Sequence, residues 1–373
     1  MSPIIRDVDL IGRLIEDAIA AHVFPAASIE VGTVDEVSWT RAFGSLSYAP
    51  DAHLTTTETV FDLASLTKVI ATTTIAMRLI DRGVVALDSP VRSWIREWRH
   101  EDRRQTTVRD LLEHCSGLPS WLPLFETCTS REEVLTALDQ CALEYEPRQA
   151  SVYSDLGFIL LGCLLEAAGG ATLDRQWAGI RDDVFGAGRD IALTYLPPAV
   201  WKERTAPTRI NPRRGRLLVG DVDDDNAWLL GGVAGHAGLF GSSGAVGQFA
   251  RGVMQSLDGA SDGGRRIARH ATIQTFVTPS VVPGSSRALG WDTMRPTSSC
   301  GSRMSPEAIG HTGFTGTSLW IDPTQNLYVV LLTNRVYPRA DAAEPIQQVR
   351  RAVHDAVYPG PLPRPGGPPP PGF

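Results

Sequence analysis

The sequence predicts a mixed α/β (α+β) fold, in which an antiparallel sheet flanked by terminal helices carries an inserted, mainly helical region. Two observations predict it. Segments rich in β-forming residues occur near both ends of the chain, and the central part has apolar residues at helical spacing. Because strands from the two ends can pair in one sheet, we expect an α/β domain of residues 1–64 and 286–358, and a helical region of residues 65–285.

The first part of the chain predicts a helix, two strands and a second helix. Apolar residues at helical spacing predict an amphipathic helix over residues 7–22. The runs 27–32 and 37–43 are rich in β-forming residues and are separated by a short polar segment, which is typical of a hairpin. A helical pattern then covers residues 65–82. Ser65 therefore lies where a region of strands and loops gives way to a helix.

The remaining elements follow from the same patterns. Four more helices are predicted over residues 107–114, 131–141, 155–168 and 243–256. After about residue 286 the pattern predicts strands over residues 288–294, 318–321 and 327–333. A last helix is predicted over residues 345–357, and residues 359–373, which are mostly proline and glycine, predict a disordered tail.

The composition is that of an ordinary globular protein. Hydrophobic residues make up 43% of the 373 residues and charged residues 21%. The 35 Lys and Arg residues stand against 42 Asp and Glu residues, giving a net charge of −7 without a basic run, so we expect no nucleic-acid partner. No apolar run is long enough to cross a bilayer, so we expect no membrane span. The oligomeric state is left open.

The cysteines and the N-terminal segment bear on the cellular compartment. The chain has 5 scattered cysteines and no CxxC pair, which argues against a disulfide framework and against a zinc site. We expect reduced and mostly buried thiols. The first residues lack the charged and then apolar pattern of a signal peptide, so we expect a cytoplasmic protein.

No metal or cofactor is expected. Asp221, Asp223 and Asp225 match the first three ligand positions of a calcium loop, but Asn226 and Gly232 replace its glycine and its bidentate glutamate. The chain also contains no P-loop and no Gly-x-Gly-x-x-Gly pattern, and no Gly-x-Ser-x-Gly turn of the α/β-hydrolases.

A hydroxyl and an amine stand three residues apart at Ser65 and Lys68. Residues at this spacing lie on the same face of a helix, so Lys68 Nζ can reach Ser65 Oγ. An adjacent lysine can activate a serine as a nucleophile once the lysine is partly removed from water. An isolated Ser-x-x-Lys is a weak signal, because the serine can equally be a helix cap.

Two further stretches carry candidate chemistry. Tyr153 precedes a predicted helix, and we expect the positive end of the helix dipole to lower the pKa of its phenol. Residues 311–316, His-Thr-Gly-Phe-Thr-Gly, join two predicted strands and combine a ring, hydroxyls and approachable backbone. Taken singly, the first can be a core or capping tyrosine and the second an ordinary turn.

The order of these three stretches resembles the penicillin-recognising serine hydrolases, which include class C β-lactamases, D,D-peptidases and related esterases. Their pattern is Ser-x-x-Lys, then Tyr-x-Asn, then Lys-Thr-Gly or His-Thr-Gly. Residues 107–119 also resemble the family's segment after the nucleophile helix. Residues 220–227 and 231–238 resemble a branch linked to cell-wall recycling, which includes muropeptide amidases. The resemblance implies a β-lactamase/transpeptidase-like fold over roughly residues 8–357.

The resemblance also implies roles for individual residues. Ser65 corresponds to the nucleophile, Lys68 to its activator and Tyr153 to the proton shuttle. The backbone N–H groups of Ser65 and Phe314 correspond to the oxyanion hole. The residues expected to contact substrate are Asp155, His311, Thr312, Gly313 and His236. The other histidines, among them His114, are expected at surface or packing positions.

The chain departs from the family pattern at two positions. Asp155 replaces the usual asparagine; its charge either disfavours anionic substrates or forms an ion pair with Lys68. His311 replaces the lysine of many β-lactamases and attracts a substrate carboxylate less strongly. Both substitutions argue against efficient β-lactam hydrolysis.

The sequence therefore predicts a serine hydrolase that cleaves an ester or amide through an acyl-Ser65 intermediate. Its expected substrate is a small ester, amide or muropeptide-like molecule, and its type is esterase, D,D-peptidase or muropeptide amidase. The alternative is a catalytically silent protein of the same fold that binds or senses a ligand.

Overall fold

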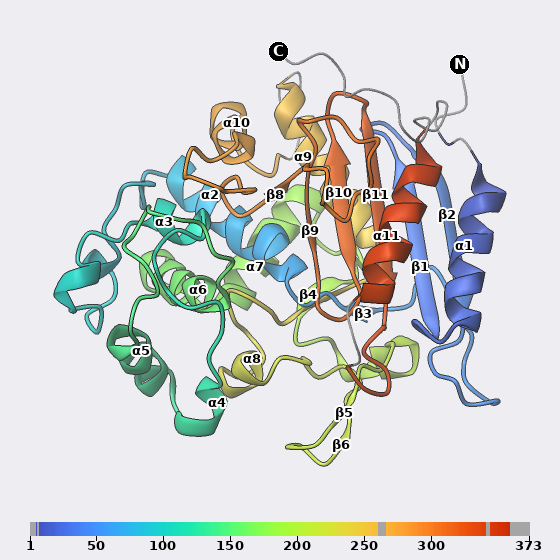
Figure 1. Cartoon of the computed structure of the whole chain (residues 1–373), viewed down its shortest axis with the longest axis horizontal. Coiled ribbons are helices and arrows are strands. Elements are labelled where there is room, and N and C mark those ends of the chain that lie inside the picture. Colours follow the sequence, from blue (N-terminus) through green and yellow to red (C-terminus); the bar gives the residue numbers. More distant parts are fainter. Residues whose placement is uncertain (1–4, 6, 260–265, 341–343, 359–373) are drawn as a thin grey trace.

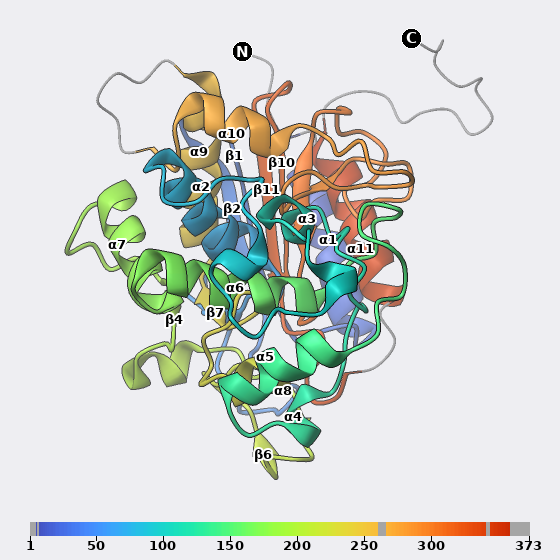
Figure 2. The same cartoon turned by 90° about the vertical axis from the view of Figure 1, so that its left-hand side faces the viewer.

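A computed structural model describes residue 5 and residues 7–259, 266–340 and 344–358 of the chain. It has a mixed α/β architecture with antiparallel sheets, as predicted. In Figure 1 the largest sheet stands beside a mainly helical part, and Figure 2 shows that part from its outer side. The predicted tail, residues 359–373, lies outside the described residues. The predicted division into two domains stays a prediction.

The largest sheet has six strands in the order β2-β1-β11-β10-β9-β8. β1, near the N-terminus, pairs antiparallel with β11, near the C-terminus, so that Ala27 lies opposite Thr333. The strands are β1 (Ala26–Gly32), β2 (Val37–Gly44), β3 (Phe61–Asp62), β4 (Leu193–Tyr195), β5 (Ile210–Asn211), β6 (Arg216–Leu217), β7 (Leu239–Gly241), β8 (Asp292–Thr293), β9 (Ile309–Thr312), β10 (Ser318–Asp322) and β11 (Leu327–Thr333). β3, β7 and β4 form a second small sheet, and β5 and β6 form a hairpin.

Helices cover both faces of the six-stranded sheet. The terminal helices α1 and α11 pack together on one face, and α9 packs on the other (Figure 1). The α-helices are α1 (Val8–Ala20), α2 (Thr73–Asp81), α3 (Val108–Leu112), α4 (Leu124–Thr127), α5 (Arg131–Gln140), α6 (Asp155–Gly169), α7 (Leu173–Phe185), α8 (Asp225–Leu229), α9 (Ser243–Asp258), α10 (His270–Val277) and α11 (Glu344–Val357). A π-helical segment, Lys68–Thr72 (η1), precedes α2. Short 3-10 helices cover Val91–Ser93, Glu101–Arg103 and Ala199–Arg204.

The structure corrects part of the C-terminal strand prediction. The predicted strand 288–294 is wrong for most of its length, because Gly290 adopts a φ of +86° and Asp292–Thr293 alone forms a strand. β9 was not predicted as a strand, and its second residue is a glycine. That glycine, Gly310, is required by packing, because a Cβ atom there would lie 2.3 Å from the Trp320 ring.

The predicted helix 107–114 is shorter in the structure. α3 ends at Leu112, and His114 has a left-handed φ of +55°. α7 and α10 were not predicted.

Of the described helices, none is both long and apolar enough by itself to cross a bilayer. α6 and α7 meet such a criterion only as a pair that is bent by 71°. The 5 cysteines are free thiols, and those other than Cys141 are buried.

The fold brings three segments together: residues 233–237, α6 and η1. Residues 233–237 lie between α6 and η1: a Cβ atom on Gly235 would come within 2.0 Å of the Phe158 carbonyl oxygen. Thr72 Oγ1 donates a 2.6 Å hydrogen bond to Gly235 O, and Tyr195 OH donates to Ala234 O. The segment is thus held by backbone contact that leaves no space for a side chain.

We expect Gly235→Ala to destabilise the protein by about 1–3 kcal/mol, because the added methyl group would overpack this contact. The matched control is Gly179→Ala in α7, where a Cβ atom meets nothing within 4 Å and alanine favours the helix. Thermal unfolding monitored by circular dichroism should show a lower Tm for the first variant and an equal or higher Tm for the second. Equal Tm values for both variants would contradict the packing argument.

Candidate active site

Ser65 lies at a strained junction between β3 and η1. The residue before it, Ala64, has a φ of +47°, a left-handed value that is unfavourable for a residue with a Cβ atom. Lys68, the first residue of η1, donates a 3.1 Å hydrogen bond from Nζ to Ser65 Oγ. The predicted reach of the lysine to the serine is therefore confirmed.

Lys68 is fully buried and has three hydrogen-bond acceptors. Its Nζ contacts Ser65 Oγ, Asp155 Oδ1 at 2.6 Å and the His236 carbonyl oxygen at 3.1 Å. Burial alone lowers the pKa of Lys68, but the Asp155 carboxylate and the Tyr153 hydroxyl raise the pKa above its usual value overall. Lys68 is therefore a cation at neutral pH, and of the two possibilities for Asp155, the ion pair is the one that forms.

Tyr153 approaches Ser65 from the other side. Its hydroxyl donates a 2.8 Å hydrogen bond to Ser65 Oγ. Burial and the Asp155 carboxylate raise the pKa of Tyr153, although Lys68 opposes them. The expectation that the start of α6 would lower this pKa is wrong, because burial outweighs the helix dipole.

His114 holds the tyrosine segment in place. Its ring lies 4.8 Å from the Tyr153 ring and 4.9 Å from the Phe158 ring, measured between centroids. Its Nδ1 accepts a 3.0 Å hydrogen bond from Ser154 N, and burial keeps the pKa of His114 well below its usual value. This histidine is a packing residue, as expected, and it packs against Tyr153.

The turn between β9 and β10 carries Phe314, the second predicted oxyanion donor. Among the residues that the structure describes, neither the Ser65 N–H nor the Phe314 N–H donates to a protein acceptor. Thr317 Oγ1 donates to Leu63 O at 3.0 Å and joins this turn to the nucleophile segment. A Cβ atom on Gly313 would lie 2.6 Å from the same oxygen, so the close approach requires glycine.

His311 and Thr312 end β9, next to that turn. The His311 ring is buried, and its Nδ1 lies 2.8 Å from the Thr312 carbonyl oxygen. Because a carbonyl oxygen can only accept, Nδ1 carries the proton and Nε2 is an acceptor. Burial, with Arg287 and Lys68 nearby, lowers the pKa of His311 well below its usual value, so this histidine is neutral.

His236 contacts the acidic segment, residues 221–225, which leads into α8. Its Nε2 lies 2.8 Å from Asp224 Oδ1. Burial alone raises the pKa of Asp224, but His236 and the hydrogen bond from Ala227 N lower it to about 2. Asp224 also caps α8 through that bond. The acidic segment therefore fixes the residue whose carbonyl oxygen holds Lys68.

These groups surround one cleft of about 750 Å³, a volume typical of small-molecule sites. Of the predicted site residues, those that line the cleft are Ser65, Tyr153, Asp155, His236, His311, Thr312, Gly313 and Phe314. Lys68 lies behind Ser65, Tyr153 and Asp155, with which it is in contact.

Sequence reasoning missed several residues of the cleft wall. The missed residues include arginines, carboxylates and aromatic residues: Arg209, Arg287, Arg335, Arg350, Asp62, Asp292, Trp121 and Phe125. Asp62 had a local signal, since it stands three positions before Ser65. The arginines had none, because long-range folding alone brings them to the cleft.

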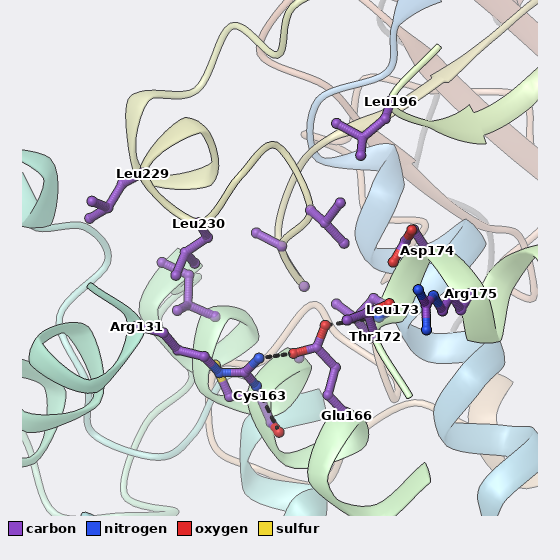
Figure 3. A pocket seen from close by; sticks show the side chains of 15 residues that line it. Arg131, Cys163, Glu166, Thr172, Leu173, Asp174, Arg175, Leu196, Leu229 and Leu230 are labelled. Atoms are coloured by element: carbon purple, nitrogen blue, oxygen red, sulfur yellow. Dashed lines mark hydrogen bonds and ion pairs between the residues drawn. The ribbon is translucent and has the colours of Figure 1, made fainter. Parts of the chain in front are cut away.

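A second cavity, of about 540 Å³, is shown in Figure 3. Arg131 and Glu166 form an ion pair on its wall, and Leu173, Leu229 and Leu230 supply apolar surface. Residues 233–235 line this cavity, whereas residues 236 and 237 line the cleft, so one short segment separates the two. None of the predicted site residues lines the second cavity.

A metal site is not among the described features. Within residues 7–259, 266–340 and 344–358, no three or more His, Cys, Asp or Glu side chains are grouped in a way that would hold a metal ion.

Curated relatives match most of the chain. A protein of Escherichia coli (strain K12), provisionally named D-alanyl-D-alanine carboxypeptidase, is 27% identical over 365 residues, covering 86% of this chain and 80% of that protein. A Salmonella gallinarum protein with the same provisional name is 29% identical over 323 residues, covering 78% of this chain and 72% of that protein.

Solved structures share the fold. EstCE1, a hydrolase with promiscuous acyltransferase activity, aligns with a TM-score of 0.73 and 20% identity over 94% of this chain and 98% of that protein. A class C β-lactamase from Rhodobacter sphaeroides aligns with a TM-score of 0.71 and 18% identity over 94% and 98% of the two chains.

The model of one protein family, described as Beta-lactamase, matches residues 11–354. This match runs from α1 to α11 and includes every residue of the cleft named above. The chain therefore belongs to the β-lactamase family and is a serine hydrolase.

Proposed function

We propose that this serine hydrolase cleaves an ester or amide bond through an acyl intermediate on Ser65. The observation that carries the proposal is the convergence of Lys68 Nζ, at 3.1 Å, and Tyr153 OH, at 2.8 Å, on Ser65 Oγ. A nucleophile, a base within hydrogen-bond reach and two unpaired N–H donors are the groups that acyl transfer needs.

Acylation requires the loss of one proton from the Lys68 and Tyr153 pair, since Lys68 is cationic and Tyr153 neutral in the resting site. The pair then takes the proton of Ser65 as Oγ attacks the carbonyl carbon. The Ser65 and Phe314 N–H groups stabilise the oxyanion, each such donor being worth about 2.7–4 kcal/mol. Tyr153 passes the proton to the leaving nitrogen or oxygen, which departs.

Deacylation repeats these steps with water as the nucleophile. Water gives a proton to the same pair, its oxygen attacks the acyl carbon, and Ser65 Oγ leaves with the proton that Tyr153 returns. This sequence regenerates Ser65 and the singly deprotonated Lys68 and Tyr153 pair, which is ready for the next acylation. It gives a function to each of the three convergent groups, which supports an enzyme over a catalytically silent binding protein.

The substrate that the cleft favours carries a carboxylate on its leaving group. The Arg287 guanidinium lies 5.1 Å from the centre of the ring of Tyr153, the proposed proton donor. Its carboxylate neighbour is Asp292, with 3.9 Å between Arg287 Nη1 and Asp292 Oδ1. A substrate carboxylate can therefore pair with Arg287 while the leaving nitrogen meets Tyr153. This geometry and the names of the relatives favour a carboxypeptidase acting on a small peptide of the peptidoglycan type.

Ester hydrolysis is a second candidate activity. Trp121 and Phe125 line the cleft, and 46% of the Trp121 surface is exposed. This aromatic wall can hold an apolar acyl group.

A cytoplasmic location stays a prediction, with which the free thiols are compatible.

Replacing the nucleophile tests the proposal. Ser65→Ala should abolish turnover of p-nitrophenyl butyrate and covalent labelling by a fluorophosphonate probe, because both need Ser65 Oγ. Ser93→Ala, at an exposed position outside the cleft, serves as the control and should retain both. Undiminished turnover by Ser65→Ala would refute the proposed function.

Replacing the partner of Lys68 tests the proton step. Asp155→Asn removes the carboxylate that raises the pKa of Lys68, so the base should form at lower pH. The limb of kcat/KM that rises with pH as the Lys68 and Tyr153 pair loses its proton, measured with the ester, should therefore move to lower pH. Asp182→Asn, which removes a half-exposed partner of Arg181 outside the cleft, should leave the limb in place. An unmoved limb in Asp155→Asn would contradict the assignment of the Lys68 and Tyr153 pair.

A substrate panel tests specificity: p-nitrophenyl butyrate, nitrocefin, a D-Ala-D-Ala peptide and a muramoyl peptide. We expect measurable ester hydrolysis and weak nitrocefin turnover, because neutral His311 attracts the nitrocefin carboxylate less strongly than a lysine would. Arg287→Gln should lower kcat/KM for the D-Ala-D-Ala peptide by about tenfold or more and leave the ester unchanged, since the ester lacks the carboxylate. Arg287→Lys should restore part of the loss. Nitrocefin as the best of the four substrates would contradict the argument from His311.

A further inference from the structure

Asp62 connects three segments of the active site. Its Oδ1 accepts a 2.8 Å hydrogen bond from Ala64 N, and its Oδ2 accepts a 2.7 Å bond from Asp223 N. Its backbone oxygen accepts a 2.7 Å bond from Thr315 Oγ1. The side chain is 2% exposed and lines the cleft. Neither the proposed catalytic steps nor substrate recognition uses this carboxyl group.

The first of these bonds acts on the strained residue before the nucleophile. Ala64 has a left-handed φ of +47°, which residues with a Cβ atom adopt when surrounding contacts hold them there. The carboxylate of Asp62 binds the N–H of Ala64, and the peptide plane that follows Ala64 carries the Ser65 N–H. The direction of that oxyanion donor therefore depends on the conformation that Asp62 holds.

The other two bonds anchor Asp62 itself. Thr315, which follows Phe314, joins the backbone of Asp62 to the turn that carries the second oxyanion donor. Asp223, in the acidic segment, joins the carboxylate to the loop that also holds His236 through Asp224. Asp62 is therefore hydrogen-bonded to both segments that carry the oxyanion donors, the one with Ser65 and the one with Phe314.

We infer that Asp62 is a positioning residue that sets the Ser65 N–H in the oxyanion hole, with the acidic segment, residues 221–225, as its anchor. The inference rests on the proposed function, because it assigns the Ser65 N–H to transition-state stabilisation. It also gives a role to the acidic run, whose match to a calcium loop is incomplete.

The ionisation of Asp62 links this arrangement to pH. The charged groups that shift the pKa of Asp62 are Asp223 and Asp224 of the acidic segment. Asp223 Oδ1 lies 3.1 Å from Arg209 Nε, and Asp224 Oδ1 contacts His236 Nε2. Burial and the Asp223 carboxylate raise the pKa of Asp62 to about 7, against the two backbone hydrogen bonds. Above this pH both carboxylate oxygens of Asp62 accept their backbone hydrogen bonds, from Ala64 N and Asp223 N. As the pH falls through this value, protonation of Asp62 removes one of the two acceptors, so activity should fall.

Asp62→Asn tests the inference, because the amide retains an acceptor for Ala64 N but places an N–H donor against Asp223 N. With p-nitrophenyl butyrate, we expect kcat to fall at least about tenfold while KM changes little, since removal of an oxyanion donor costs about 10²–10³ in kcat. Fluorophosphonate labelling should slow in parallel, and the limb of the pH profile near 7 should disappear. Asp88→Asn, which removes an exposed ion pair with Arg109 outside the cleft, is the matched control.

Several outcomes would overturn the inference. A folded Asp62→Asn with the kcat, labelling rate and pH limb of the control would do so. If circular dichroism shows that Asp62→Asn does not fold, Asp223→Asn decides: loss of its charge should move the limb near 7 to lower pH, and an unmoved limb would overturn the inference. Ser65→Ala separates the two hypotheses, because activity in that variant refutes the proposed function, whereas its inactivity beside a normal Asp62→Asn refutes the role of Asp62 alone.

Discussion

The site depends on a buried cation. Lys68 has no exposed side-chain surface, and a charge in that position is tolerated only with close partners. Its partners come from three separate segments: Ser65 from its own turn, Asp155 from the start of α6 and the His236 carbonyl from the segment between two cavities. Removing one partner from a buried ion pair typically costs about 3–5 kcal/mol. The docking of α6 and of residues 233–237 therefore stabilises the fold and assembles the site at once.

A second constraint joins the sheet to this helical part. The turn after β9 reaches the nucleophile segment through two threonine hydroxyls, from Thr315 and Thr317, and leaves no space for a side chain at Gly313. The two proposed oxyanion donors lie on opposite sides of this seam. Their separation is therefore set by hydrogen bonds between segments about 250 residues apart in sequence.

The ion pair between Lys68 and Asp155 also changes how the replacement of the family's asparagine by Asp155 is interpreted. A carboxylate at this position was a reason to expect poor binding of anionic substrates. Since Asp155 is paired with Lys68, much of its charge is compensated, and its main effect is on the proton that Lys68 retains. In the proposed function, Arg287, whose guanidinium lies 5.1 Å from the centre of the Tyr153 ring, attracts the substrate carboxylate that neutral His311 does not.

The sequence by itself determined the fold class and the identity of the candidate reacting groups. Periodicity located α1, α6, α9, α11 and the pairing strands of the two termini, because buried faces repeat at the helix or strand period. The spacing of Ser65 and Lys68 placed two side chains on one helical face, which is a local property. Tyr153, His311 and Phe314 were recognised by the order of their motifs.

Tertiary structure decided what those groups experience. The pKa of Tyr153 rises instead of falling because burial, which depends on the whole fold, outweighs the local helix dipole. The strand predicted over residues 288–294 breaks at Gly290, which has a φ of +86° and packs so closely against Thr73 that a Cβ atom there would lie 2.1 Å from Thr73 Oγ1. Arg287, Asp224 and the anchoring of Asp62 by Asp223 involve contacts between residues distant in the chain, and no local pattern encodes such contacts.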